Sequence, residues 1–138
     1  SGGRLGQRTV IGTHLAHPSP RGRLPASGVA APGSGGGRWP GQVEVIDLRT
    51  IVPWDRTAVL ASVKKTGKCL VVHEDTYTGG FAGEVIATVA AEAFEHLDAP
   101  VTRVGAMDTP VAYAPEVEEV ILPQTDDVLN AIEKVAAY

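Results

Sequence analysis

From residue 43 onward, short β-branched runs alternate with stretches of helical periodicity, and this alternation constrains the fold more than any other feature. Strands are predicted over three runs, "VEVIDL", "CLVVH" and "APVTRVG". Helices are predicted over three longer segments, "RTAVLASVKKTG", "AGEVIATVAAEAFEHL" and "TDDVLNAIEKVAAY". Strands and helices that alternate at this spacing form a mostly parallel sheet covered on both faces. The predicted fold class is therefore α/β.

Particular side chains are expected to set the ends and faces of these helices. Asp55 can cap the first helix at its N-terminus, and Gly67 can end it. Thr125 is predicted to cap the last helix, with two acids in the first turn. Three apolar residues of the long helix are predicted to face the core: Val85, Val89 and Phe94.

Charge divides the chain into two unlike parts. Residues 1–41 contain five arginines, no acid, 11 of the 16 glycines and half of the prolines, whereas residues 42–138 carry a net charge of −9. The first part buries too little apolar surface to offset its chain entropy and is predicted to be largely disordered. A basic arm for nucleic acid is the alternative for residues 18–41. Spaced arginines without lysine clusters make a poor phosphate track, so no nucleic-acid partner is predicted.

The single cysteine and the hydropathy of the chain limit its class further. Cys69 alone permits no disulfide framework and no cysteine-based zinc cluster, and its place in "KCLVVHE" predicts a buried strand residue. No apolar stretch approaches the ~20 residues of a membrane span. The first residues, "SGGRLGQRTV", contain no hydrophobic signal core. We expect a soluble protein in a reducing compartment, with a mitochondrial transit peptide as the second interpretation of the arginine-rich start.

The segment "HEDTYTGGFAGE", residues 73–84, ends a strand and turns through paired glycines into a helix. Ligands of open α/β sheets bind at such carboxyl ends, so the segment is a candidate anion-binding loop. It lacks the lysine, the hydroxyl and the spacing of a phosphate-binding motif, and a structural turn is the preferred interpretation. His73 could act as a general base with Glu74 as its partner. Because adjacent strand residues point to opposite faces, a packing role for His73 is favoured.

Three further clusters indicate no chemistry of their own. His14 and His17 have metal-ligand spacing but no third ligand, and His96 suits the negative end of a helix. The acids of "PEVEEV" together with Asp98 could attract a basic partner. No nucleophile, base and acid occur together, so we expect no catalytic, cofactor-binding or metal-binding residue in this chain.

Four segments carry a resemblance to a known family: "VEVIDLRTIVPWD", "SVKKTGKCLVVHEDTYTGGFAGEV", "LDAPVTRVGAMDTPVAYAP" and "ILPQTDDVLNAIEKV". Together they resemble the transketolase C-terminal domain, specifically that of the beta subunit of thiamine-dependent 2-oxo acid dehydrogenases of the pyruvate or branched-chain type. The resemblance implies a three-layer α/β/α sandwich, usually with one antiparallel edge strand. It divides the chain into a segment of residues 1–41 and a domain of residues 42–138.

The resemblance also implies cofactors and partners. In the assembled enzyme, which oxidatively decarboxylates 2-oxo acids and passes the acyl group to lipoyl groups, thiamine diphosphate and Mg²⁺ are held outside this domain. The domain would support a heterotetramer with the alpha subunit and a second beta subunit. It would also dock the subunit-binding domain of the dihydrolipoyl acyltransferase, a basic helical module, through Asp98 and Tyr138. The expected compartment is the cytoplasm of a bacterium, or the mitochondrial matrix of a eukaryote.

The start of the chain departs from the family pattern. Residues 9–17, "TVIGTHLAH", resemble a degraded first strand, and the helix that should follow is replaced by the Gly/Pro/Arg stretch. A frameshift or a gene-model error would explain this, and exposed apolar sheet would then favour association. The catalytic half of the subunit is absent, so the chain alone is not expected to be catalytic. The alternatives are the C-terminal domain of a transketolase or deoxyxylulose-phosphate synthase, and a free-standing anion-binding module using residues 73–84.

Overall fold

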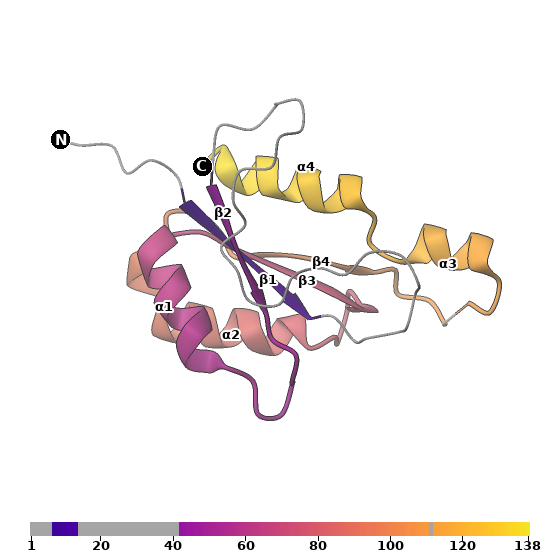
Figure 1. Ribbon diagram of the computed structural model, residues 1–138, viewed down its shortest axis with the longest axis horizontal. Coiled ribbons are helices and arrows are strands. Elements are labelled where there is room, and N and C mark those ends of the chain that lie inside the picture. The colour runs from indigo at the N-terminus through magenta and orange to yellow at the C-terminus, as the bar shows by residue number, and fades with distance from the viewer. Residues whose placement is uncertain (1–6, 14–41, 111) are drawn as a thin grey trace.

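A four-stranded sheet of order β2-β1-β3-β4 organises the molecule (Figure 1). The structure is a computed structural model and describes residues 7–13, 42–110 and 112–138. Its strands are β1 (Gln7–Thr13), β2 (Gln42–Asp47), β3 (Cys69–Thr76) and β4 (Thr102–Ala106). All pairings between these strands are parallel, so the antiparallel edge strand expected from the resemblance is not among the described residues. The predicted α/β class is confirmed.

Helices cover both faces of the sheet, which gives the expected three layers (Figure 1). The helices are α1 (Arg56–Thr66), α2 (Ala82–Glu92), the 3₁₀ turn η1 (Phe94–His96), α3 (Pro115–Ile121) and α4 (Thr125–Ala136). The connections from β2 to β3 and from β3 to β4 move in the same direction across the sheet. Right-handed crossovers of that kind leave α1 and α2 on one face, and α4 lies on the other.

The hydrophobic core lies between the sheet and the α1–α2 layer. Its buried members come from β3, from both helices and from the residues that directly follow β2 and α2: Leu48, Val59, Val63, Cys69, Val71, Ala82, Val85, Val89 and Ala93. At its rim the rings of Trp54 and Phe81 meet edge to face, with centroids 6.2 Å apart. Cys69 is fully buried, as predicted, and burial raises the pKa of its thiol to about 12.

Both predicted ends of α1 are confirmed. The Asp55 carboxylate accepts a hydrogen bond of 2.9 Å from the amide of Ala58, which satisfies one free donor of the first turn. Gly67 adopts the left-handed conformation, with φ of 73°, and its amide donates to the carbonyl of Val63 at 2.8 Å. A glycine is needed here because other residues rarely adopt that φ.

The predicted inward orientation of Phe94 is wrong. The α-helix ends at Glu92, Ala93 leaves the helical conformation, and Phe94 is 76% exposed in the 3₁₀ turn that follows. At about 100° per residue, nine residues bring Phe94 to the side of the helix opposite Val85. Ala93, eight residues after Val85, continues the buried row instead.

The predicted N-cap of α4 is also wrong by one residue. Gln124, not Thr125, occupies the N-cap position, and its side chain and that of Asp127 form a reciprocal capping box. The Asp127 carboxylate accepts from the amide of Gln124 at 2.9 Å. Asp127 thus satisfies a backbone donor as well as facing the positive end of the helix dipole, as predicted for the acids of this turn.

The start of the chain contributes one described element, β1, which lies between β2 and β3 in the sheet. Its span, Gln7–Thr13, overlaps residues 9–17, where the sequence indicates a degraded strand. Residues 1–6 and 14–41, including His14 and His17, lie outside the described residues. The predicted disorder of this part and the division at residue 42 therefore stay predictions.

Candidate docking surface

Residues 73–84 lie at the carboxyl end of β3, where the chain turns into α2 (Figure 1). β3 continues to Thr76, three residues beyond the predicted strand. His73 is 2% exposed, whereas Glu74 is exposed on the other side of the strand. The two side chains therefore do not act as a pair, as the alternation of the strand indicates.

Two glycines enclose the His73 ring. A Cβ atom added to Gly80 would collide with the ring and with the carbonyl of Thr76, and one added to Gly105 would come within 2.8 Å of the ring Nε2. Burial lowers the pKa of His73, Asp75 raises it, and Arg103 lowers it. Neither ring nitrogen has a hydrogen-bond partner within the described part of the chain. The glycines are thus explained by close packing around a buried histidine.

The first amides of α2 are already used within the turn. Gly83 donates to the carbonyl of Gly80 at 3.0 Å, and Glu84 donates to that of Phe81 at 3.0 Å. Glu84 also supplies a negative charge in the first turn. This geometry favours the structural turn over a phosphate cradle, which would need those amides to point outward.

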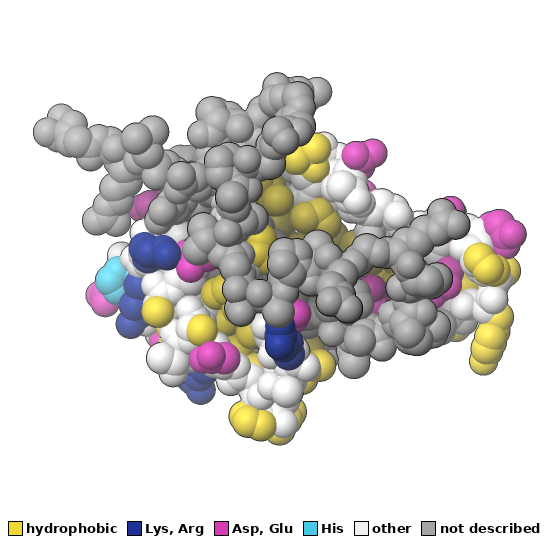
Figure 2. Space-filling view, viewed as in Figure 1, with side chains coloured by type: hydrophobic (Ala, Val, Ile, Leu, Met, Phe, Trp, Pro, Cys, Tyr) yellow, Lys and Arg dark blue, Asp and Glu magenta, His cyan; other side chains and the backbone are white. Residues whose placement is uncertain are grey.

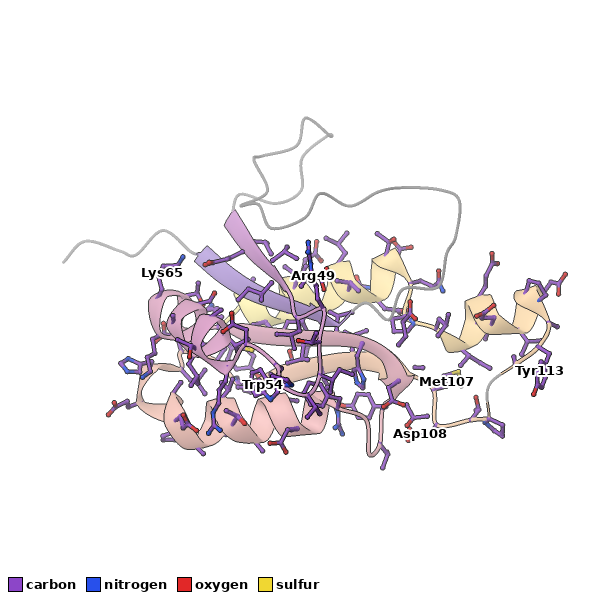
Figure 3. All side chains as sticks on the ribbon, turned by 60° about the horizontal axis from the view of Figure 1, so that its bottom comes forward. Arg49, Trp54, Lys65, Met107, Asp108 and Tyr113 are labelled. Carbon is purple, nitrogen blue, oxygen red and sulfur yellow. The ribbon has the colours of Figure 1, made fainter. Side chains whose placement is uncertain are left out.

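The contact that holds this turn is not among the contacts predicted from the sequence. The Asp108 carboxylate, after β4, accepts hydrogen bonds from the amide of Thr78 at 2.7 Å and from its hydroxyl at 2.6 Å. These bonds, the hydroxyl first, lower the pKa of Asp108. Figure 3 shows Asp108 and Met107 at the carboxyl end of β4. An acid directly after a strand, in "MDTP", was the available signal.

The two predicted docking residues lie at the opposite, amino end of the strands. The amide of Asp98 donates to the carbonyl of Gly67 at 2.7 Å, just before β3. The next residue, Lys68, donates from Nζ to the carbonyl of Ala136 at 3.2 Å, at the end of α4. Asp98 is exposed and Tyr138 is 66% exposed. We call Asp98, Tyr138 and the linking residues Gly67 and Lys68 the amino-end surface.

The acids of α3 do not join Asp98. α3 follows the carboxyl end of β4, and the amide of Met107 donates to the carbonyl of Ile121 at 3.1 Å there. Acidic side chains gather around α3 at the right of Figure 2, and Asp98 precedes the other end of β4. The acids of α3 and Asp98 therefore do not form one cluster, and their attraction for a basic partner stays a prediction.

The described residues offer no metal centre and no membrane-spanning helix. Within residues 43–110 and 112–138, no three His, Cys, Asp or Glu side chains come together in a way that could hold a metal ion. None of the described helices is long and apolar enough to cross a membrane.

Comparison with known families identifies the fold. Residues 41–128 match the family described as "Transketolase, C-terminal domain". The chain belongs to this family, in the form carried by beta subunits of 2-oxo acid dehydrogenases. The resemblance noted in the sequence is thus confirmed.

Individual relatives agree with this assignment. The chain is 47% identical over 92 residues to the pyruvate dehydrogenase E1 component subunit beta of Rickettsia bellii. The aligned region covers 67% of this chain and 28% of that protein. It is 42% identical over 95 residues to the mitochondrial 2-oxoisovalerate dehydrogenase subunit beta 2 of Arabidopsis thaliana. Here the aligned region covers 69% of this chain and 26% of that protein. The chain therefore spans less than a third of the length of these relatives.

Proposed function

We propose that this domain serves assembly and partner docking in a 2-oxo acid dehydrogenase of the pyruvate or branched-chain type. Its docking partner is the basic subunit-binding domain of the dihydrolipoyl acyltransferase, and the contact residues are Asp98 and Tyr138. The observation that carries the proposal is the amino-end surface. There, the backbone amide of Asp98 donates to Gly67, and Lys68 donates to the carbonyl of Ala136, two residues before Tyr138, so one short turn contacts both segments.

The charged side chains at the amino-end surface support a basic partner. Asp98 supplies an exposed negative charge, and Glu95, three residues before it, is 84% exposed. Two cations at this end are engaged within the domain: Lys65 pairs with Glu44 at 2.6 Å, and Lys68 donates to the carbonyl of Ala136. Figure 3 shows Lys65 at the end of α1. Complementary charge of this kind mainly speeds association and selects the partner.

The remaining functions belong to the assembled enzyme. We propose that the alpha subunit and a second beta subunit complete a heterotetramer, in which thiamine diphosphate and Mg²⁺ are held outside this domain. The proposed compartment is the cytoplasm of a bacterium or the mitochondrial matrix of a eukaryote.

Calorimetry with a purified subunit-binding domain tests the docking proposal. The full chain should bind with an affinity that falls as salt rises, because screening weakens exposed charge pairs. Asp98→Ala and deletion of Tyr138 should each weaken binding by about fivefold or more, the upper end expected for an exposed ion pair.

Glu118→Ala is the matched control, since it removes an exposed acid from α3 at the other end of the sheet. It should leave the affinity unchanged. Binding that the Asp98 and Tyr138 changes leave intact, or that the control weakens equally, would remove the amino-end surface as the docking site. Lack of binding by a chain that circular dichroism shows to be folded would refute docking as an activity of this chain.

A further inference from the structure

The outer edge of β4 has no strand partner in the described part of the molecule. β4 pairs with β3 along one side, and the sheet ends there. A free edge presents a row of backbone N–H and C=O groups that can pair with another chain. Natural sheets commonly protect such edges with charges or with a covering element.

A cavity of about 480 Å³ lies along this edge. Its floor includes three consecutive residues at the start of β4, Val101, Thr102 and Arg103. One wall is α2, with Gly83 and Ile86, and the other is α4, with Ala131 and Lys134. Because α2 and α4 lie on opposite faces of the sheet (Figure 1), the edge strand lies at the bottom of a slot between two helices. A slot of this form fits an extended chain.

The side chains of the slot favour a negatively charged occupant. Among the residues that the structure describes, its ionisable lining residues are Arg103, Lys134 and Tyr77, and none of them is a carboxylate. The Arg103 guanidinium stacks over the Tyr77 ring at 4.1 Å from its centroid, which holds this cation at the slot. The Thr102 hydroxyl is buried and has no hydrogen-bond partner among the described residues. This local basic character contrasts with the net acidic domain around it.

We propose that the outer edge of β4 is a docking site for an extended acidic segment of a partner polypeptide. The segment adds a strand to the sheet through backbone hydrogen bonds. Two adjacent acidic residues, whose side chains point to opposite faces, place one carboxylate toward Arg103 on the α2 side and the other toward Lys134 on the α4 side. The site shares no residue with the amino-end surface, so it does not rest on the proposed acyltransferase docking.

A second copy of this chain fits the edge less well. A second copy would bring its own β4 edge, with the same cations Arg103 and Lys134, against this one. Like charges facing each other across paired strands are destabilising. Charge complementarity therefore selects a different, acidic chain.

Fluorescence anisotropy with a labelled eight-residue peptide of alternating valine pairs and glutamate pairs tests the site on the full chain. We expect saturable binding that weakens with salt. Arg103→Gln and Lys134→Gln should each weaken it about threefold, as expected for exposed ion pairs. Lys64→Gln, which removes an exposed lysine of α1 outside the slot, should leave it unchanged.

Two N-methylated peptides test strand pairing without altering the protein. Alternate amides of a strand point to the same side, so methyl groups on one alternate set should reduce binding more than tenfold, about the loss of one or two hydrogen bonds. The other set should have little effect.

Three results would each overturn the proposal. They are equal binding by both methylated peptides, no saturable binding by the parent peptide, and displacement of the peptide by inorganic phosphate that supplies the same concentration of negative charge. A dimer in sedimentation equilibrium that Arg103→Gln strengthens and the peptide cannot dissociate would overturn it as well.

Discussion

Thr78 and Asp108, thirty residues apart, are joined by two hydrogen bonds, from the Thr78 amide at 2.7 Å and its hydroxyl at 2.6 Å to the two carboxylate oxygens. The turn after β3 is thereby fastened to the loop after β4. A third bond, from the Tyr77 amide to the Ala106 carbonyl at 2.8 Å, lies beside them. The carboxyl end of the sheet is consequently held by side chains as well as by strand pairing.

Asp108→Ala should loosen this turn. It should also make the free energy of unfolding less dependent on pH in the acid range. The pKa of Asp108 is lowered from 3.8, so its contribution is fully present above pH 3.8 and is lost as pH falls through the folded-state pKa. Urea unfolding from pH 5 to pH 2.5 should show a smaller loss of stability in the variant. Thr78→Val should have a similar effect, and the double variant should be no worse than either single change. Fully additive losses would show that the two residues act separately.

His73→Phe should remove a stability loss below pH 6.5. Burial lowers the pKa of His73 from 6.5, so the unfolded chain takes up a proton first and stability falls as pH decreases below that value. The slope from one proton is at most about 1.4 kcal/mol per pH unit. Unfolding free energies of the variant between pH 8 and 5 should be flatter than those of the unaltered chain.

Phenylalanine also removes two buried ring nitrogens that lack partners in the described part of the chain. The change should therefore be neutral or stabilising at pH 8, because an unsatisfied buried polar atom costs about 1–3 kcal/mol. His96→Gln, at an exposed histidine, is the control and should keep the slope. A flattened slope in the control alone would assign the pH dependence to His96.

Cys69 should not react with a thiol reagent such as DTNB while the protein is folded. Its side chain is fully buried, and a pKa of about 12 leaves about one thiolate in ten thousand at pH 8. Reaction should appear across the urea unfolding transition and follow the unfolded fraction. Rapid labelling in the absence of urea would show that the β3 end opens without global unfolding.

Gly67→Ala should destabilise the protein more than Gly79→Ala. Both glycines have positive φ, 73° and 79°, so each change imposes left-handed strain of about 1–2 kcal/mol. At Gly79 nothing lies within 4 Å of an added Cβ, whereas at Gly67 the methyl would collide with the Asp98 carboxylate. Thermal unfolding of the two variants separates the strain from the collision. Equal losses would mean that Asp98 moves aside freely.

Periodicity and end signals predicted most of the fold. The three strands after residue 42, α1 with both of its ends, and the buried state of Cys69 follow from local sequence rules that the packing did not override. One error comes from applying helical periodicity beyond the end of the helix. Phe94 was assigned to the Val85 face over nine residues, although the helix ends before it.

The candidate sites were less accessible to sequence reasoning. Asp108 acts on Thr78, and Lys68 reaches Ala136, across 30 and 68 residues respectively, and no local pattern encodes such contacts. The β4 slot is likewise a product of three elements, because α2 and α4 enclose it only after the sheet has formed. The resemblance to a family supplied Asp98 and Tyr138, and the fold shows that both lie at the same end of the strands.

The position of β1 has a consequence for how the chain can be divided. β2 and β3 do not touch as neighbours, since β1 pairs with both of them, Val10 opposite Val45 on one side and opposite Leu70 on the other. A fragment starting at residue 42 would contain all the helices of the described residues. It would lack the strand that lies between β2 and β3. A synthetic peptide of residues 7–13 supplied separately is the natural candidate to restore it. Because β3 ends at Thr76, β1 can pair on both of its sides during synthesis only after that residue has left the ribosome.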